Sequence, residues 1–110
     1  MFLAIDIGNT NIVIGLYEGE KLTHKWRFIS TDKKTADDYA VDIIEVFLTD
    51  KIDSFKISGA IIASVVPGLT PIVREAVQKI TSESISKNIL VVGETNTKLA
   101  IDIQVKNKNE

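Results

Sequence analysis

A polar segment that follows the apolar start of the chain carries side chains suited to binding phosphate. It reads Asp6, Ile7, Gly8, Asn9, Thr10 and Asn11. Gly8 has no side chain, so backbone amides around it can approach a phosphate closely, and the next three residues add amide and hydroxyl donors. A carboxylate at the end of a buried strand, here Asp6, can hold Mg²⁺ through water because that ion gives up its hydration reluctantly. The segment therefore predicts a phosphate site with a metal ion beside it.

The same residue types also suit an ordinary hairpin turn, because glycine, asparagine and aspartate favour turns for local reasons. Apolar runs flank the segment at residues 2–7 and 12–17, as in two strands joined by a tight turn. A third run, at residues 22–29, alternates between apolar and polar residues. Three antiparallel strands are therefore expected at the start of the chain. One face of the third strand would carry Leu22, His24, Trp26 and Phe28.

Helical and strand patterns alternate in the rest of the chain. Apolar residues recur at helical spacing over residues 36–48, with Thr35 as a candidate cap. Residues 55–66 are almost all apolar or small, as in a strand covered on both faces, and we expect them to form the central strand. Thr70 and Pro71 suit the start of a second helix, with Thr70 as its cap. Two further strands are expected at residues 89–92 and 99–105.

This order of elements indicates an α/β fold with a mixed sheet, in which three antiparallel strands are followed by alternating helix and strand. By analogy, it resembles the ribonuclease-H-like fold, which also forms each half of actin-like kinase and ATPase domains. No linker, internal repeat or low-complexity tract interrupts the sequence. We therefore expect residues 1–110 to form a single actin-like domain.

Composition and charge exclude several classes of function. The 110 residues carry a formal net charge of -2 at pH 7 with both signs spread along the chain, so no basic surface for nucleic acid or an acidic membrane is expected. The chain contains no cysteine, which removes disulfides, thiolate metal sites and thiol nucleophiles. Asp6 interrupts the apolar start before a signal peptide develops, and no apolar run approaches the roughly 18 residues of a membrane span. A cytoplasmic protein is expected.

Two motifs together resemble type III pantothenate kinases. The segment from Asp6 to Asn11 is similar to the amino-terminal phosphate motif of that family. The segment Ala63-Ser64-Val65-Val66-Pro67 resembles the family's Ser-Val-Val-Pro segment, which ends its fourth strand. The first motif occurs in looser form across actin-like kinases, whereas the pair at this separation is considerably more specific. The resemblance covers essentially all 110 residues.

The resemblance implies transfer of a phosphoryl group from ATP to pantothenate, giving 4'-phosphopantothenate in the first step of coenzyme A biosynthesis. It implies that Asp6 is the magnesium-associated carboxylate and that residues 6–11 bind the ATP phosphates, with Ile12 and Val13 extending the site through their backbone. Ser64, Val65, Val66 and Pro67 would shape the cleft wall, although a turn that ends a strand explains them equally well. In the complete enzyme, the resemblance also implies a monovalent cation, K⁺ or NH₄⁺, and a homodimer.

The sequence also departs from the family pattern. The family's Gly-Ala-Asp-Arg segment supplies the catalytic aspartate, and no Asp-Arg pair occurs in these 110 residues. The family's later half, which holds the adenosine, the remaining substrate contacts and the monovalent cation, has no counterpart here. Neither Asp102 nor His24 is a convincing general base, because Asp102 alternates with isoleucines and His24 lies in an apolar pattern. We therefore expect the chain to be equivalent to the first half of a two-domain kinase and to be inactive alone, with its catalytic residues beyond its end.

Two other functions fit parts of the sequence. Bvg accessory factors share the family resemblance and are linked to transcription, so a non-catalytic nucleotide-binding or regulatory protein is the main alternative. A ribonuclease-H-like nuclease would also carry a carboxylate such as Asp6 on its first strand. Two-metal cleavage needs further carboxylates at the same site, and residues 64–67, which end the expected central strand, contain none. The kinase is therefore the preferred hypothesis.

Overall fold

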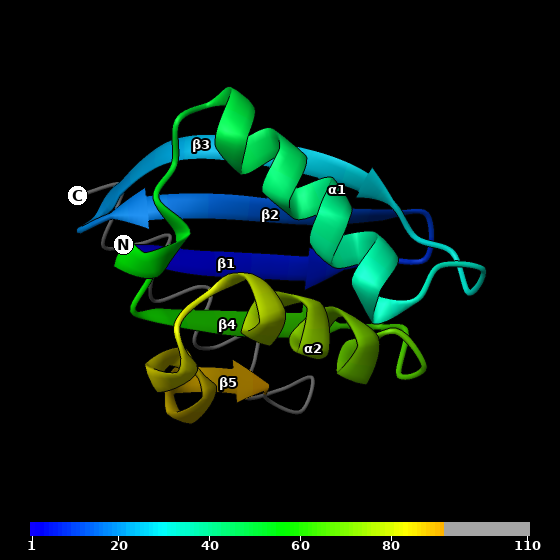
Figure 1. The fold of residues 1–110 in the computed structure, drawn as a ribbon. Helices are drawn as coiled ribbons and strands as arrows, with labels where there is room; N and C mark the ends of the chain where they lie inside the picture. The colour runs from blue at the N-terminus through cyan, green and yellow to red at the C-terminus, as the bar shows by residue number, and fades with distance from the viewer. Residues whose placement is uncertain (92–110) are drawn as a thin grey trace.

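A computed structural model describes residues 1–91 of the chain. They form a five-stranded sheet with two α-helices and two short 3₁₀ turns (Figure 1). The strands are β1 (Phe2–Ile7), β2 (Asn11–Glu18), β3 (Lys21–Ile29), β4 (Gly59–Ser64) and β5 (Ile89–Val91). The helices are α1 (Ala36–Thr49) and α2 (Thr70–Ile80), and the 3₁₀ turns are η1 (Ser54–Lys56) and η2 (Glu83–Asn88). No helix in this part of the chain is long and apolar enough to cross a membrane.

The predicted α/β class and mixed sheet are confirmed. The strand order across the sheet is β3-β2-β1-β4-β5, with antiparallel pairs on one side of β1 and parallel pairs on the other. The prediction that residues 55–66 form the central strand was wrong, since β1 lies in the middle of the sheet and β4 lies beside it. Five of the six expected strands fall within residues 1–91, and the structure forms five strands there. The sixth expected strand, at residues 99–105, lies outside the described residues.

β4 begins later than predicted because a polar side chain turns the chain before it. Asp53 accepts a hydrogen bond of 3.0 Å from the Phe55 backbone N–H and thereby caps η1. Phe55 then lies on the surface, where it is 72% exposed. The strand preference of Phe55 is overridden by this local hydrogen bond, which composition alone does not reveal.

Both helices pack against the same face of the sheet, in front of it in Figure 1. Side chains of β1 and β2 alternate between the two faces. Those that face the helices are 0–1% exposed, and they are Leu3, Ile5, Ile7, Ile12, Ile14 and Leu16. Opposite them, α1 and α2 bury Tyr39, Ile43, Phe47, Val73, Ala76, Val77 and Ile80. Full burial of one large aliphatic side chain contributes about 1.5–3 kcal/mol, so this layer is the main source of stability.

A β-bulge in β3 changes the face on which Leu22 lies. Leu22 and His24 pair with adjacent residues of β2, so Thr23 is an extra residue in the ladder. Leu22 consequently lies over Gly15, where a Cβ atom would approach the Leu22 Cδ1 atom to 3.0 Å. The prediction that Leu22 and His24 share a face was therefore wrong. His24 instead stacks on Trp26, with ring centroids 5.5 Å apart.

The predicted cap of α1 is confirmed. The Thr35 hydroxyl accepts a hydrogen bond of 3.1 Å from the Asp38 backbone N–H. In return, the Asp38 carboxylate accepts one of 2.9 Å from the Thr35 N–H. The bonds from Thr35 favour the charged carboxylate, so they hold the pKa of Asp38 below its ordinary value. The two residues form a capping box that satisfies donors at the start of the helix.

Replacing Thr35 with alanine is expected to lower the free energy of unfolding by about 1 kcal/mol, because one helix donor loses its partner. A lowered pKa in the folded state stabilises the fold while the carboxyl is charged, so the Asp38 contribution is complete at neutral pH and is lost as the pH falls through the folded-state pKa. Urea unfolding at pH 7 and at about pH 3 measures this dependence. Asp38→Asn should differ from wild type more at pH 7 than at the acid pH, and equal differences would contradict the capping box.

The start of α2 differs from its prediction. Leu69, rather than Thr70, is the N-cap, and no side chain caps this helix. Pro71 lies in the first turn of the helix, at its second position rather than at the predicted first. The Thr70 hydroxyl donates a hydrogen bond of 3.3 Å to the Val66 carbonyl instead, so it closes the turn that joins β4 to α2.

Candidate functional site

Three loops meet at one edge of the sheet, on the right in Figure 1. β1, β3 and β4 run in the same direction, since β2 is antiparallel to both β1 and β3, and β4 is parallel to β1. Their carboxyl ends therefore lie at the same edge, and the chain leaves them at residues 8–10, 30–35 and 65–69. Ligand sites of α/β sheets commonly lie beyond the carboxyl ends of strands. This edge is therefore the candidate site.

The loop between β1 and β2 is a tight turn with polar groups on its outside. The Gly8 backbone N–H donates a hydrogen bond of 2.9 Å to the Asn11 carbonyl. A Cβ atom at residue 8 would lie 3.1 Å from that carbonyl oxygen, which is closer than most real side chains come. Asn9 and Thr10 are exposed, and Asn11 is half-buried at the start of β2. The turn is thus closed most easily by glycine, and its amide and hydroxyl groups are accessible to a ligand.

Two neighbouring segments bind the carbonyl groups of this turn. After β3, the Ser30 hydroxyl donates to the Gly8 carbonyl at 2.6 Å, and the Ser30 N–H donates to the Thr10 carbonyl at 3.0 Å. After β4, the Val65 N–H donates to the Ile7 carbonyl at 3.0 Å. These bonds occupy three carbonyls at or beside the turn and hold it against the neighbouring segments.

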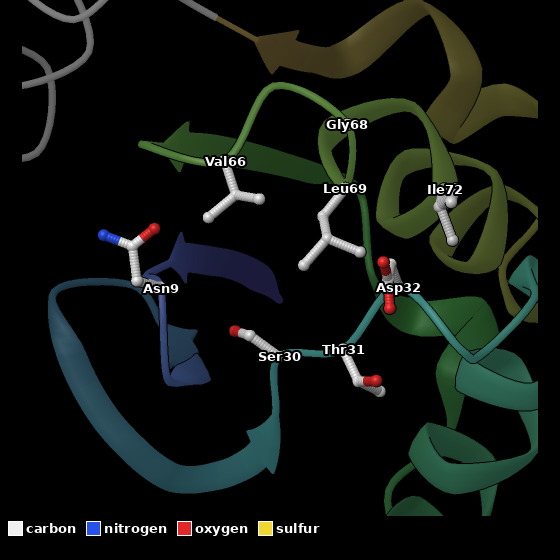
Figure 2. A pocket seen from close by; sticks show the side chains of 8 residues that line it. All are labelled: Asn9, Ser30, Thr31, Asp32, Val66, Gly68, Leu69 and Ile72. Atoms are coloured by element: carbon white, nitrogen blue, oxygen red, sulfur yellow. The ribbon is translucent and has the colours of Figure 1, made fainter.

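A hollow of about 220 Å³ lies beside the turn, between the three segments (Figure 2). Its polar side is formed by Asn9, Ser30, Thr31 and Asp32. Its apolar side, from the loop after β4 and the start of α2, is formed by Val66, Leu69 and Ile72, with Gly68 completing the lining. A mixed lining of this kind suits a small organic group. The sequence pattern singled out only Asn9 and Val66 among these residues, because the other polar ones follow a strand without forming a motif.

Asp6 lies on the face of the sheet opposite the helices, away from the hollow. It pairs with Val13 on β2 and Ala63 on β4, and its side chain is exposed. Within residues 1–91, no group of three or more histidine, cysteine, aspartate or glutamate side chains is placed to hold a metal ion. A single accessible carboxylate nevertheless fits Mg²⁺, because that ion keeps several waters and takes its other ligands from phosphate oxygens.

The other residues predicted around the phosphate turn lie within the strands. Ile7 and Ile12 are 0% and 1% exposed, and their side chains belong to the core. Val13 is half-buried and lies beside Asp6 on the opposite face. Only backbone groups of Ile7 and Ile12 can therefore reach a ligand at the sheet edge.

The predicted cleft wall forms the turn that follows β4. The Ser64 hydroxyl accepts a hydrogen bond of 3.0 Å from the Val66 N–H, which fixes the shape of the turn. Val66 lines the hollow, whereas Val65 and Pro67 are exposed. The structure thus brings Val66 and Asn9 to the same hollow.

Comparison with known families gives a match over nearly the whole sequence. A model of the family described as type III pantothenate kinase matches residues 2–110. The chain belongs to this family. In this chain the two sequence motifs lie side by side, because Ile7 of β1 pairs with Ser64 of β4.

The fold of this chain also occurs within a longer protein. A crystal structure from Porphyromonas gingivalis, of a protein provisionally designated an N-acetylglucosamine kinase, matches it with a TM-score of 0.59 and 17% sequence identity. The match covers 86% of this chain and 34% of the other chain. The 110-residue chain therefore spans about a third of the length of the protein in that crystal structure, and the likeness concerns the fold alone.

Proposed function

We propose that this chain provides the phosphate-binding half of an enzyme that transfers a phosphoryl group from ATP to pantothenate, giving 4'-phosphopantothenate, the first step of coenzyme A biosynthesis. The observation that carries the proposal is the turn at residues 8–11, whose carbonyls are bound by Ser30 and whose donors are accessible. Concave groups of amide donors favour anions such as phosphate. Membership of the type III pantothenate kinase family supports the reaction and its acceptor.

Each residue of the turn has a physical role in this proposal. Positioning and charge neutralisation provide most of the catalysis in phosphoryl transfer, so the turn has to hold the ATP phosphates in place. Gly8 allows a phosphate to approach the backbone, and Asn9, Thr10 and Asn11 donate hydrogen bonds to its oxygens. Asp6 would hold Mg²⁺ through water, and the ion when bound neutralises phosphate charge.

The turn after β4 would form the wall of the cleft near the phosphates. Val66 lines the hollow beside Asn9, so its side chain would contact a group next to the phosphates. Ser64 and Val65 would act by holding that turn, since Ser64 binds the Val66 N–H and Val65 binds the Ile7 carbonyl. Pro67 would restrict the backbone where the chain leaves the strand.

Further proposals concern the complete gene product, meaning this chain together with any residues that continue it. We infer an actin-like ATPase fold in which residues 1–110 are the first of two similar halves, in keeping with the match to 34% of a longer chain. The second half would carry the adenosine site, the catalytic aspartate and the site for K⁺ or NH₄⁺. We also propose that the complete gene product is a homodimer that acts in the cytoplasm on ATP and pantothenate, as the resemblance to the family implies.

Release of ADP from Mg-ATP, measured in potassium buffer with and without pantothenate, tests the proposal. We expect pantothenate-dependent release from the complete gene product and none from the 110-residue chain alone. Binding of Mg-ATP without turnover by the complete gene product would instead support a regulatory protein of the Bvg accessory factor type. Absence of both binding and turnover would refute the proposed phosphate site.

A further inference from the structure

The last residue of β3 and the two residues that follow it connect the phosphate turn to the buried side of α1. Ser30 binds the turn twice, since its hydroxyl donates to the Gly8 carbonyl at 2.6 Å and its N–H donates to the Thr10 carbonyl at 3.0 Å. Figure 2 shows Ser30 and Thr31 on the stretch of chain that borders the hollow together with Asn9. We call residues 29–31 the strap. One side of the strap therefore faces the phosphate turn.

The other side of the strap is bound by the hydroxyl of Tyr39, on the first turn of α1. This hydroxyl accepts a hydrogen bond of 3.1 Å from the Thr31 N–H, and it lies 3.1 Å from both the Ile29 and the Thr31 carbonyl, to which it can donate. Tyr39 is 2% exposed and belongs to the core. Its ring is therefore held by close packing, and the hydroxyl is a fixed point for the strap.

We infer that Ser30 and Tyr39 are positioning residues for the phosphate turn. The inference rests on the proposed function of residues 8–11. Asn9 and Thr10 lie between β1 and β2, beyond the last pair of the ladder, so strand pairing does not fix them. The strap bonds to the carbonyls on either side of Asn9, which sets the direction of the donors around it. Hydrogen bonds weaken steeply as their distance and angle change, so a small shift of the turn reduces phosphate binding.

The dissociation constant of Mg-ATP, measured by calorimetry on the complete gene product, tests this inference. Ser30→Ala removes the bond to the Gly8 carbonyl and is expected to weaken Mg-ATP binding by roughly three- to tenfold, the range that corresponds to one hydrogen bond. Tyr39→Phe keeps the ring in the core but removes the hydroxyl that bonds to the strap. We expect it to weaken Mg-ATP binding by about tenfold. Ser30→Thr keeps the hydroxyl and should restore binding to within about twofold of wild type.

Trp26→Phe is the matched control. The Trp26 Nε1 atom donates a hydrogen bond of 2.7 Å to the Asp50 carboxylate, so Trp26 also joins β3 to α1, but at the C-terminal end of α1, far along the helix from Tyr39. The Trp26→Phe substitution should lower the melting temperature of the protein about as much as Tyr39→Phe does. It should leave the dissociation constant of Mg-ATP unchanged, because the strap and the turn are intact.

The outcomes separate the strap from the phosphate site itself. If wild type binds Mg-ATP and both Ser30→Ala and Tyr39→Phe bind it equally well, the positioning role of the strap is refuted. The proposed phosphate site at residues 8–11 would remain supported. Equal weakening by Trp26→Phe would also overturn the positioning role of the strap, since the effect would then follow general stability. Failure of wild type to bind Mg-ATP would overturn the proposed function and the strap with it. Melting temperatures measured on the same samples identify any variant that is unfolded.

Discussion

Replacing Asp6 with asparagine is expected to lower the pantothenate-dependent ADP release of the complete gene product on the order of a hundredfold or more. The substitution keeps the size of the side chain beside Val13 and Ala63 but removes the charge that would hold Mg²⁺. Because Asp6 is exposed, the melting temperature should change little. The turnover number at saturating ATP and pantothenate measures the effect on the chemical step.

Glu18→Gln is the matched control for Asp6→Asn. Glu18 is also an exposed carboxylate on the sheet, but it ends β2 at the opposite edge from the phosphate turn. Its neutralisation should leave the turnover number within about twofold of wild type, as for most surface substitutions. Equal effects of the two substitutions, whether both large or both absent, would contradict the role assigned to Asp6.

Ile5→Ala is expected to lower the free energy of unfolding by about 2–5 kcal/mol. Ile5 is 0% exposed in the middle strand, where it pairs with Ile14 on one side and Ile62 on the other. Close packing of the neighbouring strands and helices prevents them from filling the cavity that the smaller side chain leaves. Small domains have only about 5–15 kcal/mol of stability in total, so this one substitution removes a large part of it.

Urea unfolding followed by circular dichroism measures this loss, and Ile44→Ala is its control. Ile44 undergoes the same change of side chain but is 40% exposed on the outer side of α1. Its substitution should cost about 0.5 kcal/mol or less, because the side chain is partly in water already and alanine favours helix. Similar losses in the two variants would contradict the placement of the core between the helices and β1.

The parts of the fold that depend on local signals were predictable from the sequence. Apolar runs on either side of a glycine and asparagine turn indicated the hairpin of β1 and β2, and Thr35 indicated the start of α1. The start of β4 was not predictable from composition, because the Asp53 side chain diverts an apolar stretch into η1. The face of the sheet on which Leu22 lies was also predicted wrongly, since the bulge at Thr23 depends on how β3 pairs with β2.

The candidate site was predictable only where its residues are neighbours in the sequence. Residues 8–11 form one turn whatever the rest of the fold does, so their motif was visible directly. Ser30 reaches Gly8 only after β3 has paired with β2 and β2 with β1. Tyr39 fitted the apolar spacing of a helix, and nothing in that spacing indicates a hydrogen bond from its hydroxyl to Ile29 or Thr31. Contacts that depend on the assembled sheet therefore had to come from the structure.

The most direct test of the phosphate turn is the change in backbone amide chemical shifts when the ¹⁵N-labelled complete gene product is saturated with Mg-ATP. We expect the largest changes at residues 8–11, with smaller ones at Ser30 and Val66, which bind or adjoin the turn. Adenosine without phosphates should leave the amides of residues 8–11 nearly unchanged. Mg-ATP shifts that lie elsewhere and spare residues 8–11 would contradict the central claim that this turn binds the phosphates.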